Sequence, residues 1–242
     1  MFKTKKLQRK EFGKVLFDNL DIELKKGEIL GVLGDEMSGR KEFFDIIRGI
    51  IKPNSGEVFI GEEPVVGNVI KARKGISTSL GLEVYDNFTI NGFLKLMVNV
   101  KNVPKENTQK EIQNVLKVVD IEGKENLKVL DLDNFTKQKL AVATACIGDS
   151  QVVLLEDPFI DLDDDQKEKM KKIILKFKEN NAIIIGTDDE ILKDISDKIL
   201  VLTHKGQIEI DPKKLIKENI SLKEKQRKLL KENNIKGKHY DY

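Results

Sequence analysis

The strongest constraint on the fold comes from a segment in which a strand signal, a glycine-flanked loop and a helix signal follow one another. Residues 28–33 form a mostly apolar run without polar alternation, which is typical of a central strand buried on both faces. After the loop framed by Gly34 and Gly39, apolar residues recur at helical spacing up to Ile50. The sequence Pro-Asn-Ser-Gly at 53–56 ends the helix. The segment therefore predicts a strand, a loop and a helix in succession.

The rest of the chain alternates between strand and helix signals. Residues 15–24 alternate roughly, which indicates an antiparallel edge strand, and further strands are expected at 57–60, 76–79, 152–155, 182–186 and 199–202. Helices are expected at 89–100, 105–119, 135–147, 164–178 and 191–195. This alternation predicts an α/β fold in which helices cover a parallel sheet.

The domain organisation follows from where helices occur without strands between them. Residues 1–80 and 151–211 are predicted to form the core, and residues 81–150 an inserted helical subdomain. Residues 212–242 are rich in Lys and Glu with a helical Leu/Ile pattern, which predicts a peripheral helix with a loose end.

Composition excludes several classes of protein. With 43 basic and 41 acidic residues the net charge is +2, which gives no argument for a nucleic-acid partner, and none is expected. The single cysteine, Cys146, excludes an intramolecular disulfide and a Cys-rich metal site, and fits a reducing compartment. No apolar run approaches the roughly 20 residues that span a bilayer, so any membrane role is expected to come through a partner.

Several segments carry a family resemblance because they occur in a fixed order and at matching separations. They are 24–34 (Leu-Lys-Lys-Gly-Glu-Ile-Leu-Gly-Val-Leu-Gly), 56–61, 89–94, 154–163 (Leu-Leu-Glu-Asp-Pro-Phe-Ile-Asp-Leu-Asp), 187–189 and 198–202. Over roughly residues 12–210 the chain resembles the ATP-binding subunit of ATP-binding cassette (ABC) transporters. The resemblance implies a P-loop ABC ATPase-like fold, with a mostly parallel central sheet, an antiparallel β edge and an inserted helical subdomain.

The resemblance also implies cofactors, partners and a location. ABC ATPase subunits bind ATP with Mg²⁺, pair head-to-tail with a second such subunit, and drive a membrane permease. The expected location is therefore cytoplasmic, peripheral on the inner face of the cell membrane, and the second subunit is expected to be a different chain or a second copy.

The phosphate loop of the family corresponds here to a nine-residue segment: Gly34, Asp35, Glu36, Met37, Ser38, Gly39, Arg40, Lys41 and Glu42. In the family, the backbone amides of this loop cradle phosphate, a Lys neutralises the outer phosphates and a hydroxyl ligates Mg²⁺. Arg40 replaces that Lys, Lys41 replaces the hydroxyl, and Asp35 and Glu36 add repulsion on the order of 1 kcal/mol per pair. Either the loop is now only a connection or it binds nucleotide weakly.

The acidic motif of the family, Asp-Glu, is inverted here to Glu156-Asp157. The longer side chain of Glu156 keeps a carboxylate that can reach a Mg²⁺-bound water. Asp157 stands where the base for the attacking water is expected, but its side chain is one methylene shorter. Hydrolysis is therefore predicted to be badly impaired.

Two further motifs of the family are altered, and one aromatic position is retained. Asp188 stands at the switch position, where a His contacts the terminal phosphate, and an ionised carboxylate only accepts hydrogen bonds. The signature segment lacks both glycines and reads Leu132, Asp133, Asn134, Phe135 and Thr136. Phe12 matches the aromatic residue that stacks on adenine, with simple packing of that ring as the alternative.

The framework residues of the family are retained while nearly every side chain that touches phosphate or water is changed. The sequence therefore predicts a degenerate, non-hydrolysing ABC subunit that pairs with a competent ATPase subunit and docks on a permease. The alternatives are a slow but genuine ATP-hydrolysing transport subunit, with Arg40 or Lys41 as the phosphate cation, and a free-standing regulatory protein.

Overall fold

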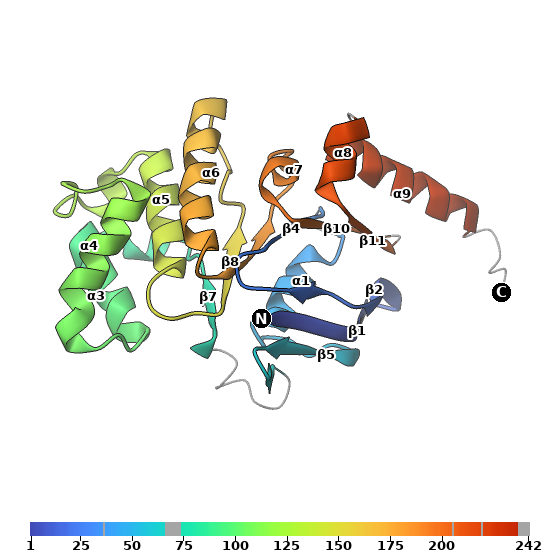
Figure 1. Cartoon of the computed structure of the whole chain (residues 1–242), viewed down its shortest axis with the longest axis horizontal. Coiled ribbons are helices and arrows are strands. Elements are labelled where there is room, and N and C mark those ends of the chain that lie inside the picture. Colours follow the sequence, from blue (N-terminus) through green and yellow to red (C-terminus); the bar gives the residue numbers. More distant parts are fainter. Residues whose placement is uncertain (36, 66–73, 205, 219, 237–242) are drawn as a thin grey trace.

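The computed structural model describes residues 1–35, 37–65, 74–204, 206–218 and 220–236 (Figure 1). Glu36, one of the phosphate-loop positions, lies outside the described residues. The described strands are β1 (Phe2–Glu11), β2 (Lys14–Leu20), β3 (Glu23–Leu24), β4 (Ile29–Leu33), β5 (Ser55–Ile60), β6 (Glu63–Pro64), β7 (Ile76–Thr78), β8 (Val152–Glu156), β9 (Ala182–Gly186), β10 (Lys198–Thr203) and β11 (Gly206–Ile210).

The described helices are α1 (Arg40–Ile47), α3 (Ile90–Val100), α4 (Thr108–Val119), α5 (Asn134–Ala145), α6 (Asp164–Lys178), α7 (Leu192–Ile195), α8 (Pro212–Glu218) and α9 (Leu222–Lys236). Short 3₁₀ turns are η1 (Glu83–Tyr85), η2 (Lys105–Asn107) and η3 (Val129–Asp131). The expectations for residues 164–178 and 182–186 coincide with α6 and β9.

The central sheet has the order β11-β10-β4-β9-β8-β7 and is parallel except for the β10–β11 pair. Strands β4, β8, β9 and β10 are buried on both faces, and their successive residues belong to different apolar clusters. In β4, for example, Ile29 and Leu33 face one cluster while Leu30 and Val32 face the other. This is the two-sided burial that a parallel sheet requires, and it confirms the α/β prediction.

The two faces of the central sheet are covered differently. On one face, α1 lies between the central sheet and a second, antiparallel sheet of order β2-β1-β5-β6, with β3 paired to β1 (Figure 1). Phe43 and Phe44 of α1 fill this layer, and Phe17 of β2 meets Phe43 edge to face at 5.9 Å. The other face is covered by helices, among them α6 and α7.

Helices α3, α4 and α5 gather at the end of the molecule next to β7 and β8, while α8 and α9 lie at the opposite end (Figure 1). Their apolar side chains form one continuous cluster with those of the sheet. The division of the chain into a core and a helical subdomain stays a prediction.

Four expectations about the elements were wrong. Strand β1 was missed because a β-bulge interrupts its alternation: Lys6 has φ +46° and the register to β5 shifts between Lys5 and Gln8. Residues 15–24 form two strands, β2 and β3, rather than one. Strand β11 was also missed, and the single C-terminal helix is two, α8 and α9.

Candidate functional site

Three neighbouring parallel strands, β4, β9 and β8, end at the same edge of the central sheet. Each is followed by one of the segments that the sequence singled out, namely the loop from Gly34, the turn from Thr187 and the turn from Asp157. Because the carboxyl ends of parallel strands meet, positions far apart in the sequence come together here. This edge is the candidate site.

The loop after β4 keeps the shape that its glycines specify. Gly39 has φ +89°, and a Cβ there would lie 2.9 Å from the Cβ of Leu16. A Cβ on Gly34 would lie 2.3 Å from Oγ of Ser38. Within the loop, Ser38 donates its hydroxyl to the carbonyl of Asp35 at 2.6 Å, and the amide of Met37 donates to Oδ1 of Asp35 at 3.2 Å. Two donors of the loop, the Ser38 hydroxyl and the Met37 amide, thus bond to another residue of the same loop.

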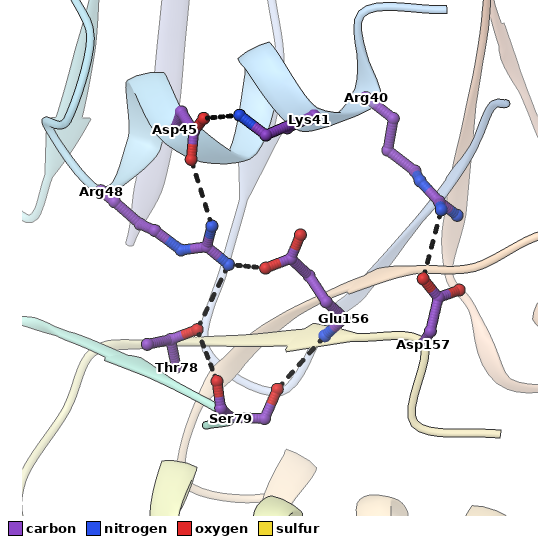
Figure 2. Close-up of polar contacts among 8 residues, drawn as sticks. All are labelled: Arg40, Lys41, Asp45, Arg48, Thr78, Ser79, Glu156 and Asp157. Atoms are coloured by element: carbon purple, nitrogen blue, oxygen red, sulfur yellow. Dashed lines mark hydrogen bonds and ion pairs between the residues drawn. The ribbon is translucent and has the colours of Figure 1, made fainter. Parts of the chain in front are cut away.

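Arg40 bridges the three strand ends. Its Nη2 lies 3.2 Å from Oδ2 of Asp157 and its Nη1 lies 3.6 Å from Oδ1 of Asp188, and Figure 2 shows the first contact. The side chain of Arg40 is 20% exposed, while those of Asp157 and Asp188 are 39% and 55% exposed. The cation at the family's lysine position is therefore neutralised by two carboxylates of the same chain.

Asp188 also takes a backbone donor from the phosphate loop. Its Oδ1 accepts a hydrogen bond from the amide of Gly34 at 3.2 Å. Asp157 lies next to it in a left-handed conformation with φ +43°, held by a bond from its own amide to the carbonyl of Gly186 at 2.7 Å. The structure thus brings together Arg40, Asp157 and Asp188.

A second arginine, Arg48 at the end of α1, holds the other acidic residue of the motif. Its guanidinium pairs with Glu156, with Oδ1 of Asp45 at 3.3 Å and with the hydroxyl of Thr78 at 3.4 Å (Figure 2). Burial lowers the pKa of Arg48, and Asp45 partly offsets this. The amide of Glu156 donates to the Ser79 hydroxyl at 3.3 Å. The carboxylate of Glu156, which was expected to reach a Mg²⁺-bound water, is instead paired with the guanidinium of Arg48.

Lys41 points away from the strand ends. Its Nζ lies 2.9 Å from Oδ2 of Asp45 one helical turn along α1, and its side chain is 76% exposed. The hydrogen bond and charge of Asp45 raise the pKa of Lys41. Glu42 follows in the first turn of α1. The side chain of Lys41 therefore lies on the exposed surface of α1 rather than at the strand ends.

The signature segment caps α5. Asp133 is the N-cap residue, and its Oδ1 accepts from the amide of Thr136 at 2.9 Å while its Oδ2 accepts from the Thr136 hydroxyl at 2.7 Å. Burial opposes ionisation, but these bonds and the charge of Lys124 outweigh it and lower the pKa of Asp133. A carboxylate of this chain thus occupies the helix N-terminus, where an anion would bind.

The other signature residues serve local contacts. Leu132 is buried, the side-chain amide of Asn134 donates to the carbonyl of Asp161 at 3.2 Å, and the ring of Phe135 lies 4.6 Å from the ammonium of Lys139. The segment is therefore built into the helical part of the chain through its own side chains.

Phe12 is almost fully exposed, at 98% of its surface, and has φ +47°. It lines a depression of about 280 Å³ whose other walls include Leu16, Met37, Gly39 and His204. The alternative in which the ring merely packs against its sheet is wrong. The depression adjoins the phosphate loop because Met37 and Gly39 belong to both.

The residues at the strand ends do not fit Mg²⁺-ATP as they stand. The loop amides of Gly34 and Met37, the guanidinium of Arg40 and the N-terminus of α5 are engaged by carboxylates of this chain, and Glu156 is engaged by Arg48. Among the described residues, no group of three His, Cys, Asp or Glu side chains converges to hold a metal ion. Sequence reasoning found Arg40, Asp157 and Asp188 but missed Asp45 and Arg48, which lie beyond the loop motif.

Comparisons with known proteins agree on one family. A family model described as ABC transporter matches residues 17–160. The chain is 29% identical over 195 residues to the ABC transporter ced-7 of Caenorhabditis elegans, covering 79% of this chain and 11% of that protein. It is 27% identical over 203 residues to the Fe(3+) ions import ATP-binding protein FbpC of Pasteurella multocida, covering 82% of this chain and 58% of that protein. The chain thus spans less than two thirds of each relative.

A solved structure of cbiO1 from Clostridium perfringens, described as part of the ABC transporter complex cbiONQ, has the same fold. Its TM-score is 0.80 at 22% identity, over 90% of this chain and 91% of that one. In the part of the chain that the structure describes, no helix combines the length and apolarity needed to cross a bilayer.

Proposed function

Because the chain belongs to the ABC transporter family, we propose that it is a non-hydrolysing nucleotide-binding-domain subunit whose role is architectural. In this account it pairs with a competent ATPase subunit and docks on a membrane permease, peripheral to the inner face of the cell membrane and on its cytoplasmic side. ABC cassettes as a family bind ATP with Mg²⁺, dimerise and work with permeases. What sets this chain apart is its phosphate site.

The observation that carries the proposal is the bridge from Arg40 to Asp157 and Asp188. A nucleotide phosphate would have to displace both carboxylates from the cation and then lie beside them. Because solvent screens these half-exposed carboxylates, each charge pair is worth about 1 kcal/mol, and the displaced carboxylates would oppose the phosphate by an amount comparable to what Arg40 offers. In this account the cation that would bind phosphate is already paired with carboxylates of the same chain.

The same reasoning applies to hydrolysis. Asp157 is held by Arg40, and Asp188 accepts a loop amide, so neither carboxylate is placed to activate a water beside a phosphate. The signature helix is capped by Asp133, so the N-terminus that would face a partner's nucleotide is already engaged. The fold that supports association is retained while the chemistry is blocked.

The test is ATP turnover by the assembled transport complex, purified from its native cell, with Asp157→Asn in this chain. We expect the turnover of the complex to be unchanged, because hydrolysis belongs to the partner subunit. Asp161→Asn, an exposed neighbour on the same turn, is the matched control. Turnover that falls at least tenfold with Asp157→Asn but not with Asp161→Asn would establish a slow, genuine ATPase instead.

A further inference from the structure

We propose that Arg48 is a built-in replacement for a divalent cation, so that the end of β8 is closed to Mg²⁺ and stable without metal or nucleotide. The inference rests on the proposed function and deepens it, because it says how the blocked site is held. It concerns the chemistry of Glu156, which the family resemblance had linked to Mg²⁺.

The surroundings of the Arg48 guanidinium are those of a cation site. Carboxylates approach it from α1 and β8, with Asp45 at 3.3 Å and Glu156 in direct contact, and the Thr78 hydroxyl approaches from β7 at 3.4 Å. Ser79 fixes the backbone of Glu156 through its hydroxyl. Figure 2 shows the oxygens of Asp45, Glu156 and Thr78 converging on the Arg48 guanidinium. Carboxylate and hydroxyl oxygens are the ligands that Mg²⁺ prefers, usually with only one or two carboxylates.

The guanidinium is well suited to take that place permanently. It stays charged under all ordinary conditions and presents several donors in a fixed plane. The side chain of Arg48 is only 18% exposed, and its guanidinium lies over the ring of Phe44, with 5.7 Å between the guanidinium carbon and the ring centroid. Packing therefore holds the charge in one position, as coordination would hold an ion.

Arg40 completes the arrangement. Arg40 is the first residue of α1 and Arg48 directly follows its last residue, so the two lie eight positions apart, a rise of about 12 Å. They reach the adjacent residues Asp157 and Glu156. Glu156 ends β8 and Asp157 follows it with a left-handed backbone, and each carboxylate meets its own arginine. Together the two side chains supply a charge of +2 to the acidic pair, the charge that one Mg²⁺ ion would bring.

The test uses Mn²⁺ alone, followed by the loss of the free-ion EPR signal, on the full chain without nucleotide. We expect the wild-type chain to bind no Mn²⁺ at concentrations on the order of 1 mM. Arg48→Met should bind about one equivalent, because Glu156 is then left without its cation and Asp45 keeps only the exposed Lys41, and Arg48→Met combined with Glu156→Gln should lose that binding. Arg9→Met is the matched control, because Arg9 is similarly buried at 20% exposure and pairs with Glu11.

Thermal unfolding supplies the second measurement. Mg²⁺ at 10 mM should raise the Tm of Arg48→Met by about 3 °C and leave the wild type and Arg9→Met unchanged. If Arg48→Met is unfolded without metal, Mn²⁺ should restore its circular dichroism spectrum. The inference is overturned if wild-type protein binds Mn²⁺ through Glu156, or if Arg48→Met, folded or not, shows no response to Mn²⁺ or Mg²⁺.

Failure here is distinguishable from failure of the proposed function. Metal binding is measured without nucleotide, whereas the role in the complex is measured by turnover with Asp157→Asn. Wild-type binding of Mn²⁺ with unchanged turnover would remove the inference about Arg48 and leave the architectural role in place.

Discussion

The Arg40–Asp157 ion pair should be measurable as a coupling energy between the phosphate loop and the end of β8. Two unit charges 4 Å apart interact by about 4 kcal/mol at an effective dielectric constant of 20 and by about 1 kcal/mol in water. Asp157 and Asp188 are 39% and 55% exposed, so solvent screening places each pair near the lower value. We expect Arg40→Met to lower the free energy of unfolding by about 1.5–2 kcal/mol.

This loss corresponds to a fall in Tm of about 3–8 °C for a chain of this size. The assay is a double-mutant cycle in urea with Arg40→Met, Asp157→Asn and the double variant. Asn is suitable because Asp157 has a left-handed backbone, which Asn tolerates. We expect a coupling energy of about 1 kcal/mol at low salt that shrinks in 1 M NaCl, where the screening length is about 3 Å.

The control cycle uses Arg9 and Glu11 of β1, whose ion pair at 3.3 Å includes none of Arg40, Asp157 and Asp188. A coupling energy for Arg40 and Asp157 below about 0.3 kcal/mol at low salt, with all variants folded, would refute the claim that this pair holds the site closed.

Three further predictions concern single residues. Asp133→Ala should cost about 1 kcal/mol at pH 7 in urea unfolding, because the α5 cap is lost. Since the folded-state pKa of Asp133 is lowered, this difference should be full above its ordinary value of 3.8 and vanish as the pH falls through the lowered value. Phe12→Ala should change the unfolding free energy by no more than about 0.5 kcal/mol, because the ring is exposed; a larger loss in thermal melts would mean that it packs. Cys146 is half-buried by its exposed surface, and desolvation of the thiol raises its pKa well above the ordinary value, so iodoacetamide at pH 8 should label it at least about tenfold more slowly than a free thiol; rapid labelling in mass spectra would contradict the raised pKa.

The sequence was sufficient for the parallel strands of the central sheet because they are short apolar runs separated by helices. It was insufficient where local rules are broken, as in β1, whose bulge at Lys6 shifts the alternation. Strand β11 carries only moderate burial, so its apolar signal is weak. Local pattern thus predicts elements well only where burial is complete on the expected faces.

The candidate site was predictable in position but not in pairing. Motif spacing placed Arg40, Asp157 and Asp188 at one edge of the sheet, yet the ion pair joins residues 117 positions apart, and nothing local specifies it. Arg48 lies outside every motif of the family, and only the packing of α1 against β7 and β8 brings it to Glu156. The sequence indicates only that functional groups of the family are lost at the substituted positions. In the structure the substituted side chains of Arg40, Asp157 and Asp188 form ion pairs with one another.

The central claim is that this chain closes its own phosphate site. Calorimetric titration of the purified chain with ATP, with and without Mg²⁺, tests it most directly. We predict no binding at millimolar ATP and no effect of Mg²⁺, because the Gly34 amide, the Arg40 guanidinium and the N-terminus of α5 are engaged by carboxylates of this chain. Micromolar affinity that strengthens with Mg²⁺ would contradict the account and show that the loop from Gly34 to Glu42 still holds nucleotide.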